Sequence, residues 1–265
     1  MAGEKNKKNH HFVLVHGGGH GAWCWYRLST LLESLGHRVT APDLAGCGVH
    51  PKRVDEVRSI DEYVGPLMEV LASLPGEERV ILVGHSFGGI GLSLAMERFP
   101  EKVSAAVYAS AIMPCLHEPM VHISLEFFKR NPFESMMDST FTFDDGPDNP
   151  PTCMIFGPEY LAKNLYQCCS SEDLKLATTL VTPAALFPEI QLKEGLFSEE
   201  KFGSVKRVFV VCGRDYIFPE GMQRWMIQNN PPDDVVEIET ADHMVMLSEP
   251  QNLCDCLLEI ADKYD

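Results

Sequence analysis

A chain of 265 residues, of which 45% are hydrophobic and 23% charged, has the composition of a folded globular protein with one α/β core and an inserted segment. The formal net charge of −16 disfavours nucleic acid and anionic membrane surfaces as partners, because both require a basic face. No apolar run reaches the roughly 20 residues that span a bilayer. The polar residues 1–10 lack the apolar core of a signal peptide, so we expect a frayed tail on a cytoplasmic protein.

The nine cysteines are scattered along the chain, and many have apolar neighbours. Cys168 and Cys169 are adjacent, whereas Cys254 and Cys256 are two positions apart, and neither spacing is typical of a zinc site. The sequence therefore predicts reduced thiols with a mainly structural role, with no metal and no cofactor.

Short β-branched segments alternate with helical patterns in the first part of the chain. Strands are predicted over 11–16, 37–43, 79–84 and 102–108, and helices over 22–35, 60–74 and from the end of the third strand to about Phe99. This alternation is typical of a parallel sheet with helices on both faces.

The alternation stops from about Met113 to Phe187, where Pro, Met, Phe and Asp are frequent and short helical pieces are separated by turns. It resumes with strands over 205–212 and 235–238 and with helices near 219–228 and from about 249. We therefore expect one doubly wound α/β core, residues 1–112 and 188–265, with a lid inserted at 113–187.

A candidate nucleophile lies in the segment Gly84-His-Ser86-Phe-Gly88, directly after the third predicted strand. A serine between small residues on a tight strand-to-helix turn exposes its Oγ beside the N-terminus of the next helix. The pattern alone is weak evidence, but its position after a buried strand favours Ser86 as a nucleophile over a serine in an ordinary glycine-rich turn.

Serine requires a base, and in this fold the base follows the acid in the chain. His243 follows the last predicted strand and precedes the last helix, whereas most other histidines come too early in the sequence. The orienting acid is predicted to be Asp215, after the strand at 205–212. Asp242 is the rival, but adjacent residues in an extended loop point apart, which disfavours a bond from Asp242 to His243.

A tetrahedral intermediate also needs N–H donors for its oxyanion. The glycines after the first strand allow close approach of the backbone, and the predicted donors are the N–H groups of Gly18 and Phe87. The missing side chains of Gly18 and Gly19 leave room beside Ser86. His20 either lines this site or is bonded to the backbone of its own loop. Methionines and aromatic residues in the lid suit a bulky apolar ligand.

A dinucleotide-binding interpretation competes for the same glycines. Residues Gly17 to Ala22 fit the G-x-G-x-x-A pattern, and Asp43 ends the second strand. Two points oppose it: the separation from Gly17 to Asp43 is a few residues too long, and Trp23 and Trp25 would hinder packing around a pyrophosphate.

With these motifs in place, the sequence resembles the plant methylesterase group of the α/β-hydrolases, which includes salicylate-binding methylesterase, polyneuridine aldehyde esterase and the plant hydroxynitrile lyases. The resemblance runs nearly end to end, through segments such as His11-Phe-Val-Leu-Val-His-Gly, Leu82-Val-Gly-His-Ser-Phe-Gly-Gly and Asp242-His-Met. It implies the triad Ser86, Asp215 and His243, with Gly18 and Phe87 as oxyanion donors.

Within this group the lyases differ from the esterases at three positions. They carry threonine, glutamate and lysine where this chain has Gly18, His85 and Met244, so the resemblance implies ester hydrolysis. Salicylate-binding relatives have a lid tryptophan that aligns with Met136, whereas polyneuridine aldehyde esterase has methionine there. Met136 and Met244 are therefore assigned to the substrate pocket, and Met136 favours a larger, alkaloid-like methyl ester.

The sequence thus predicts a serine carboxylesterase that hydrolyses the methyl ester of a small plant metabolite through an acyl-enzyme. If the ester carries a β-oxo or β-formyl group, the freed acid can lose carbon dioxide unaided. The alternatives are a hydroxynitrile lyase and a non-catalytic small-molecule receptor on the same fold. The expected partner is a small-molecule ester, and a homodimer is left open.

Overall fold

The computed structural model describes residues 9–144, 146–191, 193 and 196–265, so most of the predicted tail, residues 1–8, lies outside the described residues. His10 does not belong to a frayed tail, contrary to expectation. It is only 2% exposed, and its Nδ1 lies 2.8 Å from Oδ2 of Asp265. Its carbonyl oxygen also accepts the N–H of Arg38 at 2.9 Å. His10, which precedes the first strand, is therefore part of the packed core.

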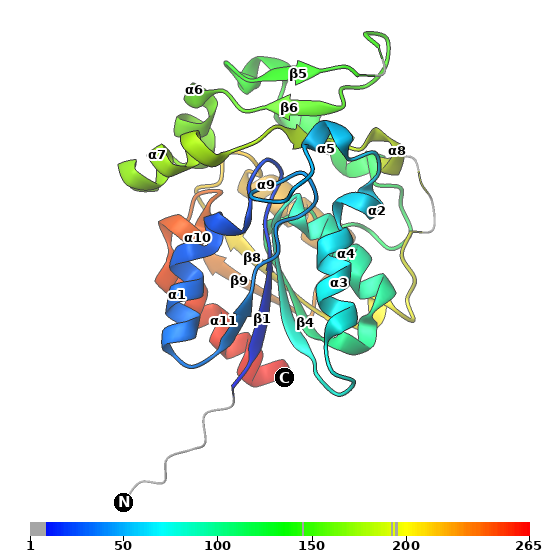
Figure 1. Cartoon of the computed structure of the whole chain (residues 1–265), viewed down its shortest axis with the longest axis vertical. Helices are drawn as coiled ribbons and strands as arrows, with labels where there is room; N and C mark the ends of the chain where they lie inside the picture. The colour runs from blue at the N-terminus through cyan, green and yellow to red at the C-terminus, as the bar shows by residue number, and fades with distance from the viewer. Residues whose placement is uncertain (1–8, 145, 192, 194–195) are drawn as a thin grey trace, which may run out of the picture.

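Six parallel strands form the central sheet in the order β2-β1-β3-β4-β8-β9 (Figure 1). The strands are β1 (His11–Val15), β2 (Arg38–Thr40), β3 (Val80–Ser86), β4 (Val103–Ala111), β8 (Lys206–Cys212) and β9 (Asp234–Ile238). β1 and β4 are buried along their whole length, as expected for a parallel sheet covered on both faces. The predicted parallel α/β sheet is confirmed.

Two layers of helices cover the sheet. α1 (Tyr26–Ser34) packs beside α11 (Pro250–Tyr264), and α3 (Gly65–Ser73) packs beside α4 (Gly88–Arg98). The two pairs lie on opposite faces, which makes the sheet doubly wound (Figure 1). The remaining core helices are α2 (Ile60–Tyr63), α9 (Glu220–Asn229) and α10 (Val245–Ser248), with short helices η1 (Ala22–Trp25), η2 (Val54–Glu56), η3 (Pro100–Lys102) and η6 (Phe202–Ser204).

The predicted helix over 60–74 is wrong in one respect, because it is divided into α2 and α3 around Val64. Pro66 lies in the first turn of α3, and proline has no N–H to donate to the carbonyl four residues earlier. The second strand is also shorter than the predicted 37–43, and it ends before Pro42 and Asp43.

The segment that breaks the alternation lies across the carboxyl ends of the core strands (Figure 1). Its elements are α5 (Val121–Arg130), η4 (Phe133–Met136), β5 (Thr140–Thr142), β6 (Cys153–Ile155), α6 (Pro158–Tyr160), the π-helical turn η5 (Leu161–Leu165), α7 (Ser171–Leu180) and β7 (Ala184–Ala185), with α8 (Pro188–Gln191) just beyond. β5, β6 and β7 form a small antiparallel sheet that the sequence did not predict. The division into a core, residues 1–112 and 188–265, and a lid, residues 113–187, stays a prediction.

Within the part of the chain that the structure describes, every helix is too short or too polar to cross a bilayer.

Candidate active site

Ser86 ends β3 and is followed almost at once by α4. Its backbone φ is +52°, in the left-handed region that a residue with a side chain rarely adopts. This strained turn lifts the serine off the sheet, at the carboxyl edge where parallel strands present their functional groups.

The glycines around Ser86 are required by the close approach of neighbouring backbone. A Cβ atom at Gly88 would lie 2.6 Å from the carbonyl oxygens of Val15 and His16, and one at Gly17 would lie 2.9 Å from Cβ of Ser86. Both distances are shorter than real carbon contacts allow. Glycine therefore lets β1 and its following loop lie directly against the turn.

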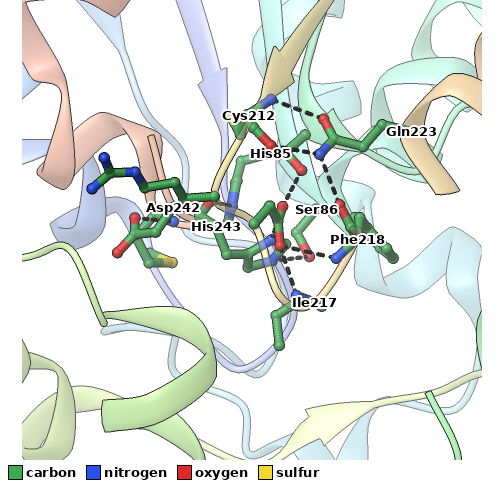
Figure 2. Close-up of polar contacts among 12 residues, drawn as sticks. His85, Ser86, Cys212, Ile217, Phe218, Gln223, Asp242 and His243 are labelled. Atoms are coloured by element: carbon green, nitrogen blue, oxygen red, sulfur yellow. Dashed lines mark hydrogen bonds and ion pairs between the residues drawn. The ribbon is translucent and has the colours of Figure 1, made fainter. Parts of the chain in front are cut away.

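His243 comes from the loop between β9 and α10 and is 2% exposed. Ser86 Oγ lies 3.0 Å from His243 Nε2, a distance at which the hydroxyl donates to the ring. His243 Nδ1 lies 2.8 Å from Asp215 Oδ2. The structure therefore brings the three predicted catalytic side chains together in one hydrogen-bonded chain (Figure 2).

Asp215 lies in the loop between β8 and α9, and it is 2% exposed. Its Oδ1 accepts the N–H groups of Ile217 at 2.7 Å and Phe218 at 2.9 Å. Its Oδ2 accepts the hydroxyl of Ser110 as well as Nδ1–H of His243. Four donors therefore hold the carboxylate in one orientation.

Gln223 supports the same loop from α9. Its amide oxygen accepts the N–H of Cys212 at 2.9 Å, and its amide nitrogen donates to the carbonyl oxygen of Cys212 at 2.9 Å and of Phe218 at 2.7 Å (Figure 2). Because Cys212 and Phe218 flank Asp215 in the chain, this one buried side chain fixes both ends of the loop that carries the acid.

Asp242, the rival acid, faces away from His243. Its carboxylate accepts the N–H groups of Cys168 at 2.8 Å and Met244 at 3.0 Å, and it also accepts the thiol of Cys169. The structure brings Asp215 to His243 and gives Asp242 other partners, which agrees with the expectation that adjacent side chains point apart.

The loop after β1 brings Gly18 next to Phe87. A Cβ atom at Gly18 would lie 3.8 Å from Cβ of Phe87. Among the described residues, neither the N–H of Gly18 nor that of Phe87 donates to a backbone group outside the regular helices and strands. Gly18 and Phe87 therefore stay candidate oxyanion donors, as predicted.

The peptide planes of this loop are fixed by two histidines. His16 Nδ1 donates to the carbonyl oxygen of Gly17 at 2.8 Å, while its Nε2 accepts the N–H of Leu44 at 3.0 Å. His20 donates from Nδ1 to the carbonyl oxygen of Gly18 at 2.9 Å. In a trans peptide the N–H points opposite to the C=O. Holding the carbonyl of Gly17 therefore also sets the direction of the Gly18 N–H.

Three histidines around the site are held in the neutral form. Burial lowers the pKa of His20 to about 4, and burial likewise lowers the pKa of His16 and, to a larger extent, that of His85. A neutral imidazole has one donor and one acceptor nitrogen, as the contacts of His16 require. These rings therefore serve as fixed hydrogen-bonding groups near neutral pH.

The four residues assigned to the substrate pocket from the sequence, Gly19, His20, Met136 and Met244, differ from one another in what they contact. Gly19 has a φ of +69°, and a Cβ atom there would lie 2.7 Å from the ring of Phe156 in the lid. Contrary to expectation, the missing side chain of Gly19 makes room for the lid and not for a ligand beside Ser86. His20 is bonded to its own loop and, through Nε2, to the hydroxyl of Tyr166 at 2.7 Å. Met136 and Met244 are buried at 3% and 0% exposure within the apolar core.

Three contacts of the site were not predicted from the sequence, although His85 itself was noted there as a position that separates esterases from lyases. Ser110 carries no carboxylate and so attracts no attention as a candidate acid, yet it donates to Asp215. His85 contacts the backbone of His243, and Tyr166 reaches His20 from the lid. Only the position of Ser110 just after the fourth predicted strand gave a usable signal, because that edge of the sheet faces the site.

Asp43, the candidate ribose-binding acid of the dinucleotide interpretation, is instead hydrogen-bonded to the backbone of the protein. Its carboxylate accepts the N–H groups of Ala22 at 2.6 Å and Val49 at 3.0 Å. A Cβ atom at Gly21 would lie 2.7 Å from Oδ1 of Asp43. The carboxylate therefore braces two loops instead of facing a ribose. The described residues contain no cluster of three or more His, Cys, Asp or Glu side chains suited to a metal ion.

The comparisons with known proteins agree with this geometry. The sequence matches the model of the alpha/beta hydrolase family over residues 12–255. It is 51% identical to Methyl jasmonate esterase 1 of Vitis vinifera, over 97% of this chain and 99% of the relative. It is 49% identical to Salicylic acid-binding protein 2 of Nicotiana tabacum, over 98% of this chain and 100% of the relative.

A solved structure shows the same similarity in three dimensions. The crystal structure of polyneuridine aldehyde esterase matches with a TM-score of 0.91 and 47% sequence identity, covering 96% of this chain and 100% of that one. The resemblance to the plant methylesterase group is confirmed, and this chain belongs to the alpha/beta hydrolase family.

Proposed function

We propose that this protein is a serine carboxylesterase that hydrolyses the methyl ester of a small plant metabolite. The observation that carries the proposal is the hydrogen-bonded chain from Ser86 through His243 to Asp215. Its similarity to Methyl jasmonate esterase 1 and polyneuridine aldehyde esterase supports a methyl ester as the substrate class.

In this mechanism His243 removes the proton of Ser86 as Oγ attacks the ester carbonyl carbon. Asp215 orients the ring and stabilises its positive charge. The N–H groups of Gly18 and Phe87 stabilise the oxyanion of the tetrahedral intermediate. His243 then gives the proton to the departing methoxide, which leaves as methanol. Water, activated by the same base, hydrolyses the acyl-enzyme and releases the acid.

The residues around the site favour an esterase over a lyase. A lyase requires a cation to hold departing cyanide, but the buried thioether of Met244 follows His243 in this chain. A receptor without catalysis would not need Asp215 held by four donors. Methionine at position 136, as in polyneuridine aldehyde esterase, supports a bulky apolar acid, and a β-oxo or β-formyl acid of this kind would lose carbon dioxide after hydrolysis. A homodimer and a cytoplasmic location stay predictions.

The test is methanol release from a panel of methyl esters that covers aryl, cyclopentyl and amine-bearing polycyclic acids. We expect at least one ester to be hydrolysed by the wild type, and Ser86→Ala to lose about 10⁴-fold or more in kcat. The matched control is Ser93→Ala, which removes a buried serine from α4 that contacts Tyr108. Equal turnover by the wild type and Ser86→Ala would contradict the proposal.

A further inference from the structure

Four consecutive residues at the end of the π-helical turn, Tyr166 to Cys169, contact three of the segments that carry the proposed catalytic groups, namely the loops of Gly18, Asp215 and His243. We name this segment the clasp. Tyr166 reaches the oxyanion loop, Gln167 reaches the loop of Asp215, and the two cysteines reach the loop of His243. The catalytic loops are far apart in the sequence, so a common partner for all three fixes their relative positions.

The contact of Tyr166 with His20 is linked through the histidine ring to Gly18 in the oxyanion loop. His20 Nδ1–H donates to the carbonyl of Gly18 at 2.9 Å, so the other ring nitrogen, Nε2, accepts from the Tyr166 hydroxyl at 2.7 Å. The rings of Tyr166 and His20 are also stacked, with centroids 6.0 Å apart. A buried tyrosine of the lid thereby fixes the tautomer and the position of the histidine that holds the carbonyl of Gly18.

The other contacts join the acid loop to the base loop. The Gln167 amide donates to the carbonyl oxygen of Arg214 at 2.7 Å, next to Asp215. The N–H of Cys168 donates to Asp242 at 2.8 Å, next to His243. The two loops are also bonded directly, since the N–H of Arg214 donates to the carbonyl oxygen of Ala241 at 2.9 Å. The clasp therefore contacts the residue before each of the two catalytic side chains.

The clasp is itself anchored to the core immediately after Cys169. Asp173, only 1% exposed, accepts the Tyr26 hydroxyl at 2.7 Å and the guanidinium of Arg27 at 3.0 and 3.2 Å. Tyr26 and Arg27 belong to α1, which packs against α11. A two-point bond from arginine to a buried carboxylate has a defined geometry. The clasp is thus a fixed part of the lid.

We propose that the clasp is a positioning element, in which the Tyr166 hydroxyl, acting through His20, holds the carbonyl of Gly18, while His16 holds the preceding peptide, which carries the Gly18 N–H. With both peptides that flank Gly18 fixed, its N–H is ready for the oxyanion. This inference rests on the proposed esterase function. Loss of the hydroxyl releases the peptide on the carboxyl side of Gly18, so Gly18 can rotate and its N–H, a donor that acts in the transition state, is misaligned. The effect therefore falls on kcat and leaves KM unchanged.

The experiment compares Tyr166→Phe with the wild type on a hydrolysed methyl ester. We expect kcat to fall about 10-fold with KM changed less than 2-fold, because misplacement of one group by a fraction of an ångström has an effect of this order. The rate constant for phosphonylation of Ser86 by a fluorophosphonate should fall by a similar factor. The matched control is Tyr108→Phe, which removes another buried tyrosine hydroxyl, bonded to Ser93 at 2.8 Å.

A double-mutant cycle separates positioning from a general loss of stability. In a His20→Ala background, Tyr166→Phe should cause no further fall in kcat, because both changes break the same path to Gly18. If Tyr166→Phe does not fold, His20→Ala, which removes the next group on the same path, is measured in its place, with the same expected fall in kcat, and wild-type kcat in His20→Ala would likewise overturn the inference. Wild-type kcat in the clasp variant, or an equal loss in Tyr108→Phe, overturns the inference. A fully active Ser86→Ala instead overturns the esterase proposal.

Discussion

His85 Nε2–H donates to the main-chain carbonyl oxygen of His243 at 2.7 Å, and the two rings lie with centroids 4.6 Å apart. His85 directly precedes Ser86, so the residue beside the nucleophile also supports the backbone of the base. Its other ring nitrogen, Nδ1, is buried without a hydrogen-bond partner among the described residues. This pattern is consistent with a neutral ring, whose pKa is lowered by burial.

His85→Ala should therefore lower both activity and stability. The carbonyl of His243 loses its donor inside the protein, which costs about 1–3 kcal/mol in the free energy of unfolding. The freed loop should also lower kcat by about 10-fold. Methanol release and urea unfolding check the two effects. The control is His117→Ala, whose side chain is 77% exposed. If His85→Ala had the same kcat and the same free energy of unfolding as this control, the contact with His243 would be unimportant.

Asp215→Asn and Asp242→Asn test which carboxylate orients the base. Asp215→Asn would keep the shape of the side chain but favour the wrong tautomer of His243, so we expect kcat to fall by about 10³–10⁴-fold. Asp242 contacts the clasp and not the ring of His243, so Asp242→Asn should lower kcat by only about 10-fold. A larger loss for Asp242→Asn than for Asp215→Asn would reverse the assignment.

Gly88→Ala should destabilise the protein because a methyl group at that position meets fixed backbone. The added Cβ would lie 2.6 Å from two carbonyl oxygens of β1 and its loop, and such overpacking costs about 1–3 kcal/mol or more. Gly65→Ala is the control: Gly65 is also the first residue of a helix, but nothing lies within 4 Å of its Cβ position. Urea unfolding of both variants gives the comparison, and equal midpoints would contradict the steric argument.

The core of the fold could be predicted because its signals are local. Segments such as Val80–Val83 are β-branched and apolar, and Gly36, which has a φ of +90°, ends a helix where the sequence indicates. Ser86 and His243 could be located from their positions after predicted strands. The assignment of Asp215 used chain order in the same way, and the structure places its carboxylate 2.8 Å from the ring of His243.

The lid contacts could not be predicted because they depend on tertiary structure alone. The small sheet pairs the three-residue strand β6 with β7, which has only two residues, too few to give a periodic pattern. Nothing local in Tyr166 indicates that its hydroxyl meets His20, 146 positions earlier in the chain. The hydroxyl of Ser110 reaches Asp215 across 105 positions. Such contacts arise from loop geometry, which has no sequence period.

The buried histidines predict that the protein loses stability in mild acid. Burial lowers the pKa of His20 to about 4, and it lowers the pKa of His16 and His85 below the usual 6.5. Between pH 6.5 and about 4 the unfolded chain therefore binds more protons than the folded one. The free energy of unfolding should fall as the pH decreases through this window, by up to about 1.4 kcal/mol per pH unit for each histidine.

One buried group acts in the opposite direction. Burial raises the pKa of Asp242 above its usual 3.8. Above pH 3.8 the folded protein therefore binds more protons at this carboxyl than the unfolded chain does, and acidification stabilises the fold through this group. Burial and the nearby Arg38 also lower the pKa of His11 to about 4, so four histidines outweigh this single carboxyl. The free energy of unfolding should therefore still rise with pH. Urea unfolding at pH 7, 6 and 5 measures the slope directly. A free energy of unfolding that is constant or higher at pH 5 than at pH 7 would mean that His16, His20 and His85 are not held neutral by the fold.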